Sequence, residues 1–339
     1  MIEAGTGRVD VSPRKPLFLV GYPHVSRTSE GVHDPLYATA LAMDTGRTVT
    51  VCVGVDILYV PADLVAHCRH RIHKQTGVGP DNILISATHT HSGPVTSEMV
   101  AWREDSLVPP PDPEYMARLE EGICGAACTA IGATEPVELT VGAAQVEGVG
   151  CNRLDPDGVR DPEAGFIAAR KPDGRLCAVQ LFYSMHPTVL HEDSKLVSSD
   201  FPGFARSHIE EQFPGAKLVY HTGPCGNLST RYHVRGQTFA EAERLGTRLG
   251  EQVCESLRAA QNWKQDLTLA SRRDYAELPP REFPSVDEAE KDLQAARETF
   301  ERLKREGAEH GKVRTAECAV FGAEEQLTLA EAQASGELD

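Results

Sequence analysis

The chain has 339 residues, 40% hydrophobic and 25% charged, which is ordinary for a globular protein and allows one large α/β domain or two smaller ones. Its formal net charge of -16 argues against a nucleic-acid-binding protein, because contacts to phosphate need a basic surface. The N-terminus carries no secretory signal, no apolar run is long enough to span a bilayer, and nine cysteines are an odd number, so we expect a cytoplasmic protein with reduced thiols.

Strand-like and helix-like segments alternate through most of the chain. Short β-branched and apolar runs predict strands, and apolar residues at helical spacing predict helices. Such alternation predicts an α/β fold in which a mixed sheet is flanked by helices on both faces. The predicted strands are residues 48–55, 83–86, 137–146, 165–169, 176–183 and 217–221, and the predicted helices are residues 60–75, 114–131, 204–212 and 239–259.

A long amphipathic helix is predicted near the C-terminus. Ser285 and Glu288 have the spacing of a capping box, which opens a helix. We expect the apolar stripe of this helix to pack on the domain or on a partner helix, and the sequence leaves open whether the chain forms a homo-oligomer. The stripe consists of Val286, Ala289, Leu293, Ala296, Phe300 and Leu303, at alternating spacings of three and four.

Two histidines follow the predicted strand at 83–86. His89 and His91 lie in the sequence THTHSGP at positions 88–94. In an extended segment, residues two apart point to the same side, so both imidazoles are expected to converge on one spot. Such a pair suits a divalent metal ion, and a hydrogen-bonded structural pair is the alternative.

A third histidine also lies at a strand end. His186 precedes a proline after the predicted strand at 176–183, and proline biases the residue before it toward an extended conformation. Strand ends gather at the ligand crevice of open α/β sheets. His186 is therefore a candidate further metal ligand, with a structural histidine as the alternative.

The loop GPCGNLSTR at positions 223–231 follows the predicted strand at 217–221. Its glycines permit tight turns and close approach to a ligand, and its amides could stabilise an oxyanion. Ser229 is a candidate nucleophile, Cys225 is a rival one, and a plain connecting loop is the structural alternative. Arg153, in a turn-rich stretch, is either a clamp for a substrate oxygen or a surface arginine.

These motifs occur in the order in which the neutral/alkaline (non-lysosomal) ceramidase family has them, and the chain resembles the N-terminal portion of that family. The resemblance implies a single ceramidase-like α/β domain over residues 1–339 and a zinc-dependent amidohydrolase. It implies that His89 and His186 bind Zn2+ and that Ser229 is the nucleophile. His91 and Arg153 match positions that contact the substrate or the developing oxyanion. The matching segments are GRVDVSP at 7–13, GVHDPLYA at 31–38, THTHSGP at 88–94, Asn152-Arg153, His186-Pro187, Ser199-Asp200 and the loop at 223–231.

The chain departs from the family in two respects. Asn227 stands where the ceramidases have Asp, and Thr230-Arg231 replaces Pro-Asn, as in shorter bacterial relatives. The Glu and Tyr that complete the zinc site lie in Pro-Gly-Glu and Gly-Tyr phrases further downstream in the family. The resemblance therefore implies a chain truncated at its C-terminus.

Three functions follow as hypotheses. The first is a ceramidase-like zinc hydrolase acting on a lipid or small-molecule amide, of the N-acylsphingosine type. The second is a metal-dependent hydrolase of the same fold that acts on another small amide or ester. The third is an inactive fragment or binding protein that lacks the downstream Glu and Tyr ligands, because a catalytic zinc normally has three protein ligands.

Overall fold

The computed structural model describes residues 1–103 and 105–338. These residues separate into two compact units. The single domain expected over residues 1–339 stays a prediction, because compact units can belong to one domain. Unit 1 comprises Met1–Tyr22, Ser26–Ser97 and Pro110–Arg273, and unit 2 comprises Pro23–Val25, Glu98–Pro109 and Asp274–Asp339.

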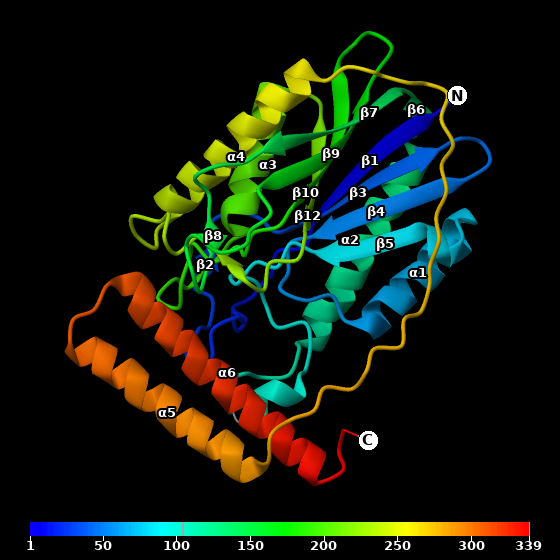
Figure 1. The fold of residues 1–339 in the computed structure, drawn as a ribbon. Helices are drawn as coiled ribbons and strands as arrows, with labels where there is room; N and C mark the ends of the chain where they lie inside the picture. Colours follow the sequence, from blue (N-terminus) through cyan, green and yellow to red (C-terminus); the bar gives the residue numbers. More distant parts are fainter. Residues whose placement is uncertain (104, 339) are drawn as a thin grey trace. The chain divides into compact units, whose positions relative to one another are not determined.

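The first sheet of unit 1 has five strands in the order β5-β4-β3-β1-β6. β1 pairs antiparallel with β3 and β6, β3 pairs antiparallel with β4, and β4 pairs parallel with β5 through the helix α1. The helices α1 and α2 cover the outer face of this sheet (Figure 1). The bounds are β1 (Glu3–Asp10), β3 (Tyr37–Asp44), β4 (Val49–Val55), β5 (Ile83–Ala87), β6 (Glu135–Pro136), α1 (Ala62–Thr76) and α2 (Pro113–Gly132).

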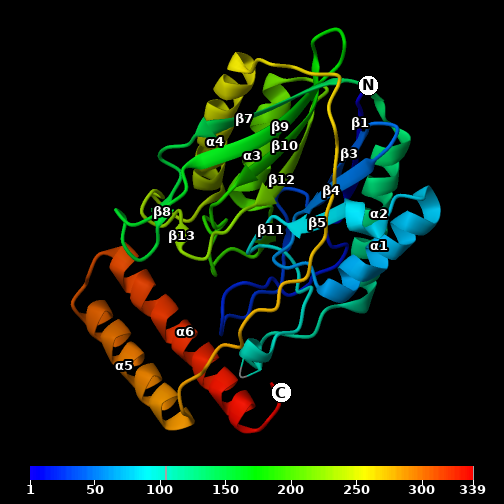
Figure 2. The same ribbon diagram turned by 45° about the vertical axis from the view of Figure 1, so that its right-hand side comes forward.

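The second sheet has four strands in the order β12-β10-β9-β7. β7, β9 and β10 are antiparallel neighbours, and β10 pairs parallel with β12 through the helix α3. The helices α3 and α4 cover the outer face of this sheet (Figure 2). The bounds are β7 (Glu138–Gln145), β9 (Glu163–Arg170), β10 (Leu176–Tyr183), β12 (Lys217–Thr222), α3 (Asp200–Gln212) and α4 (Phe239–Ala259).

Two short strand pairs and a 3₁₀ turn complete the regular structure described in unit 1. β2 pairs parallel with β11, and β8 pairs antiparallel with β13. The bounds are β2 (Gly31–Val32), β8 (Cys151–Asn152), β11 (Leu196–Val197), β13 (Leu228–Ser229) and η1 (Pro80–Asn82).

The two sheets pack face to face, so the described part of unit 1 has four layers: helices, sheet, sheet, helices. Larger apolar cores lie between each sheet and its own helices, and a smaller core lies between the sheets. The predicted α/β class with helices on both outer faces is confirmed. The strands divide between two mixed sheets, whereas the sequence predicts one. The core between the sheets includes Ile2, Ala4, Leu41, Met43, Val137, Leu139, Ala169, Ala178 and Val219.

Unit 2 contains η2 (Val100–Trp102) and two long helices, α5 (Val286–Arg305) and α6 (His310–Ala334), which pack against each other. The predicted capping box is present: Ser285 Oγ accepts from the backbone N of Glu288, and the Glu288 side chain accepts from the backbone N of Ser285. Arg297 on α5 pairs with Glu324 on α6 at 2.9 Å. None of the helices described in either unit combines the length and the apolar character needed to cross a bilayer.

The sheets approach each other most closely where β4 passes β12. A Cβ atom on Gly54 would lie 2.3 Å from the carbonyl oxygen of Tyr220, which is closer than any tolerated contact. Because the obstacle is backbone, neither strand can move away without disturbing its own sheet. Glycine is therefore required at this point.

We expect Gly54→Ala to lower the free energy of unfolding by about 2 kcal/mol, because the added methyl group pushes the sheets apart. Urea unfolding measures this change. Gly165→Ala in β9 is the matched control, since a Cβ atom at Gly165 meets no heavy atom within 4 Å. Equal stability of the two variants would contradict the tight contact.

Candidate metal centre

The sequence motifs that contain His89 and His91, His186, and Ser229 follow the strands β5, β10 and β12 respectively. β5 pairs parallel with β4, and β12 pairs parallel with β10. Carboxyl ends of parallel strands lie at one edge of a sheet. A hydrogen bond joins the two sheets at this edge: Thr222 Oγ1 donates to the carbonyl oxygen of Thr88 at 2.6 Å. The fold thus brings the loops after β5 and β12 together.

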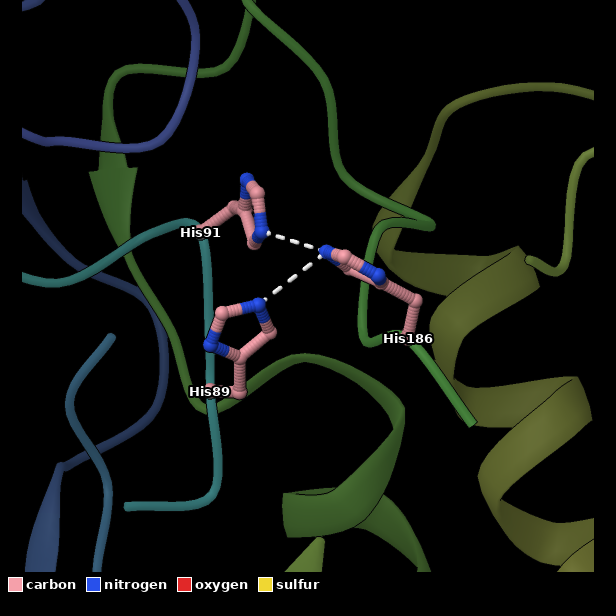
Figure 3. A group of neighbouring side chains, drawn as sticks. All are labelled: His89, His91 and His186. Atoms are coloured by element: carbon pink, nitrogen blue, oxygen red, sulfur yellow. Dashed lines mark hydrogen bonds between the residues drawn. The ribbon is translucent and has the colours of Figure 1, made fainter. Parts of the chain in front are cut away.

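Three imidazoles converge here (Figure 3). The Nε2 atom of His186 lies 3.1 Å from Nε2 of His89 and 2.9 Å from Nε2 of His91. The rings of His89 and His91 are nearly perpendicular, with centroids 5.1 Å apart. All three predicted histidines therefore meet at one point, and among the described residues they form the one cluster with the spacing of metal ligands.

The other nitrogen of each ring is held by a backbone carbonyl. The Nδ1 atom of His89 donates to the carbonyl oxygen of Leu58 at 2.9 Å, and the Nδ1 atom of His91 donates to the carbonyl oxygen of Gly21 at 2.8 Å. In His186, Nδ1 lies 3.3 Å from the oxygen of Cys225. Because a carbonyl only accepts, each Nδ1 carries the proton and each Nε2 presents a lone pair.

Three lone pairs facing one another repel unless a cation lies between them. The residues fit a metal ion, because bonds of about 2.0–2.1 Å in tetrahedral geometry place ligand nitrogens about 3.3 Å apart, close to the spacing found here. Carbonyl groups that orient the far nitrogen are also the usual outer shell of metal-binding histidines. The donor set of neutral imidazoles suits zinc better than magnesium or calcium.

Burial keeps these histidines neutral. It lowers the pKa of His89, and it lowers that of His91 well below the ordinary value, with a further contribution from the two neighbouring rings. The pKa of His186 falls to about 3, first through burial and then through the charges of His89, Arg153 and Arg231. Neutral imidazole is the form that binds metal ions.

His89 has an unusual backbone conformation, with φ +68°. A non-glycine residue at positive φ is uncommon and needs support from its surroundings. Here the backbone N of His89 donates to the oxygen of Ile57 at 2.9 Å, and Thr90 Oγ1 donates to the oxygen of Ser198 at 2.7 Å. The THTH segment is thus a turn held by hydrogen bonds on both sides of His89, and the two imidazoles converge although His89 is not in the extended conformation.

The loop before β2 contributes two residues that sequence reasoning missed. Arg27 is fully buried and donates to the carbonyl oxygens of His91, at 2.8 Å, and of Ser194, at 2.9 and 3.0 Å. Gly21 has φ +122°, and a Cβ atom there would lie 2.5 Å from the His91 ring. Neither residue belongs to a motif with a recognisable spacing, so the sequence carries no signal for them.

Asp200 anchors the loop that follows His186. It begins α3 with φ +55°, and its carboxylate accepts from the backbone N of Val189 at 3.1 Å and of Leu190 at 3.0 Å. Burial raises the pKa of this carboxyl to about 7. The Ser199-Asp200 motif therefore acts on the position of His186 through the backbone, and α3 begins four residues before the predicted helix.

Ser229 lies on β13, which pairs with β8, and Arg153 directly follows β8. Ser229 is opposite Cys151, and the backbone N of Arg153 donates to the oxygen of Asn227 at 2.8 Å. Ser229 is buried, and its Oγ accepts from the backbone N of Arg231 at 3.2 Å. The catalytic roles of Ser229 and Arg153 stay predictions.

Cys225 is in the same loop as Ser229. Burial raises the pKa of its thiol to about 11, so the reactive thiolate is scarce at neutral pH. The carbonyl oxygen of Cys225 orients His186, which gives this residue a backbone role. The raised pKa argues against Cys225 as a nucleophile at neutral pH, and the choice of Ser229 stays a prediction.

Comparison with known proteins supports the same family as the motifs. The model of the neutral/alkaline non-lysosomal ceramidase family, N-terminal region, matches residues 3–238. A neutral ceramidase from Pseudomonas aeruginosa is 22% identical over 250 residues, which is 68% of this chain and 37% of the relative. One from Drosophila pseudoobscura pseudoobscura is 24% identical over 236 residues, 64% of this chain and 33% of the relative. The chain thus spans about a third of the length of these relatives.

Two solved structures share the fold. A ceramidase complexed with C2 superposes with a TM-score of 0.70 and 21% identity, over 77% of this chain and 44% of that one. A neutral ceramidase from Pseudomonas aeruginosa superposes with a TM-score of 0.69 and 20% identity, over 77% of this chain and 45% of that one.

A fourth histidine, His221 on β12, is buried inside the protein. Its Nδ1 donates to Ser86 Oγ at 2.7 Å, and the Gln180 amide donates to its Nε2 at 3.0 Å. Burial lowers its pKa from 6.5 to about 4. The folded protein therefore holds this ring neutral over a range in which the unfolded chain protonates it.

We expect His221 to contribute to acid destabilisation. Its stabilising effect is present above pH 6.5 and is lost as the pH falls toward 4, an effect of about 3 kcal/mol. Urea unfolding of the metal-free protein across this range should show a shallower pH dependence for His221→Asn than for the parent. His70→Asn, at an exposed position on α1, is the control and should keep the parent's slope. An unchanged slope in His221→Asn would exclude this role.

Proposed function

Since the chain belongs to the neutral/alkaline non-lysosomal ceramidase family, whose model matches residues 3–238, we propose that it is a zinc-dependent hydrolase of an amide bond. The observation that carries the proposal is the convergence of three Nε2 atoms: those of His91 and His89 lie 2.9 and 3.1 Å from that of His186. The names of the relatives make a ceramide-like lipid amide the first substrate to test.

The metal site rests on His89 and His186. Their Nε2 lone pairs face each other, and their Nδ1 protons are engaged by backbone carbonyls, so both rings are held ready for one ion. Bound zinc supplies Lewis acidity, which lowers the pKa of an oxygen nucleophile and polarises the scissile carbonyl.

His91 has a more specific role than contact with the substrate. Its Nδ1 donates to Gly21, so its Nε2 is an acceptor and has no proton to donate to an oxyanion. This lone pair can bind the same ion or accept the proton of the attacking hydroxyl. Metal analysis of His91→Ala separates the two roles, because only the first requires metal to be lost.

Ser229 is the proposed nucleophile: its Oγ bonds to the carbonyl carbon, the amide nitrogen leaves as the amine with the hydroxyl proton, and water then hydrolyses the acyl ester to release the acid and restore the hydroxyl. The backbone N of Arg231 donates to Oγ and orients it. Arg153, directly after β8, brings positive charge to the edge where the carbonyl oxygen gains negative charge.

We expect the purified protein to contain near-stoichiometric zinc and the His89→Ala and His186→Ala variants to lose it, with affinity at least about 10-fold lower. Elemental analysis after dialysis measures this. His70→Ala, at an exposed position on α1, should retain zinc. Parent protein free of zinc under these conditions would contradict the metal site and favour the inactive fragment or binding protein.

We expect Ser229→Ala to lower amide hydrolysis by at least about 1000-fold while zinc content stays at the parent level, because the variant removes the attacking oxygen and no proposed ligand. Release of fatty acid from an N-acylsphingosine measures the rate. Cys225→Ala is the matched variant in the same loop, and its rate should stay within a few-fold of the parent. Retained hydrolysis in Ser229→Ala would exclude Ser229 as the nucleophile.

A further inference from the structure

One residue holds both ends of the loop at 153–159, which follows β8. Asn227, directly before β13, accepts at its carbonyl oxygen from the backbone N of Arg153 at 2.8 Å. The side-chain Nδ2 of Asn227 donates to the carbonyl oxygen of Val159 at 3.2 Å. Arg153 begins the loop and Val159 ends it, so Asn227 fastens the whole loop to the neighbouring strand β13 (Figure 2).

A second amide side chain supports the same loop from β8. Asn152 Nδ2 donates to the carbonyl oxygen of Val159 at 3.0 Å, and Asn152 Oδ1 accepts from the backbone N of Leu154 at 3.0 Å and of Asp155 at 3.3 Å. A carbonyl oxygen has two lone pairs and can accept both amides at once. The carbonyl group of Val159 therefore links the loop to β8 through Asn152 and to β13 through Asn227.

The contact between Asn227 and Val159 requires an amide. A carbonyl oxygen only accepts, so the atom that faces it must carry a proton. The Nδ2 atom of asparagine carries two protons, whereas an aspartate carboxylate has none at neutral pH and would turn a negative oxygen toward the carbonyl group. Changing this one side-chain atom is therefore expected to release the end of the loop.

The loop carries Arg153, and β13 carries Ser229. The charge of Arg153 contributes to the lowered pKa of His186, so this charge acts at the metal centre. β8 and β13 pair only Leu228 with Asn152 and Ser229 with Cys151, and a two-stranded ladder is marginally stable alone. The ladder by itself is thus a weak constraint on the position of Arg153 relative to Ser229.

We propose that Asn227 is a positioning residue of the active site, which clasps the 153–159 loop and so fixes the charge of Arg153 relative to Ser229. The inference rests on the proposed amide hydrolysis. A charge stabilises the developing oxyanion best when it is in place before the reaction begins, because no energy is then spent on moving it. Asn227 acts through the loop, so its replacement should affect the rate of the chemical step and leave metal binding intact.

A double-mutant cycle tests the proposal with the zinc-loaded protein and N-octanoylsphingosine. We expect Asn227→Asp to lower kcat by about 10-fold, with KM within about 2-fold and zinc content at the parent level. In an Arg153→Gln background the same change should cost less than about 2-fold, because the charge that Asn227 positions is already absent. Asn262→Asp, at an exposed position after α4, makes the same chemical change elsewhere and should keep the parent's rate.

An equal loss of rate in both backgrounds would show that Asn227 does not act through Arg153, and an unchanged rate in Asn227→Asp would show that it positions nothing. Either result overturns the proposal. If the parent fails to cleave N-octanoylsphingosine, the proposed function is in question, and hydrogen exchange at the backbone N of Arg153 tests the clasp separately. Exchange at least about 10-fold faster in Asn227→Asp supports the clasp, and unchanged exchange overturns it.

Discussion

The close approach of three imidazole nitrogens is the constraint on which the rest of the structure depends. Nε2 atoms 2.9 and 3.1 Å apart, each presenting a lone pair, are tolerated only if a contact at Nδ1 holds each ring in its orientation. The carbonyl groups that hold them belong to Leu58, Gly21 and Cys225, in three different loops. Every loop must therefore keep its position to within a fraction of an ångström, and the surrounding architecture provides that rigidity.

The two-sheet arrangement supplies the rigidity. Each sheet contains one parallel pair joined by a helix, and the ends of both pairs meet where the bare backbone at Gly54 lets the sheets approach. Buried charged groups then fasten the loops: Arg27 holds the carbonyl of His91, and Asp200 holds the amides that follow His186. Arg206 on α3 also pairs with Asp56 after β4 at 2.8 Å, which joins the sheets at the same edge. Such buried charges cost desolvation energy, and here they specify position.

The sequence by itself determined the local elements and the residues of the centre. Apolar runs located β5, β10 and β12, the periodicity of 239–259 located α4, and the motifs after the strands named His89, His91 and His186. Only the tertiary structure decided that the strands form two sheets, because a strand buried between a helix layer and a second sheet has the same apolar pattern as one buried in a single sheet. It also decided which ring nitrogens carry protons and brought Arg27 to His91. Those contacts join residues 64 and 70 positions apart, and no local pattern records a partner at that distance.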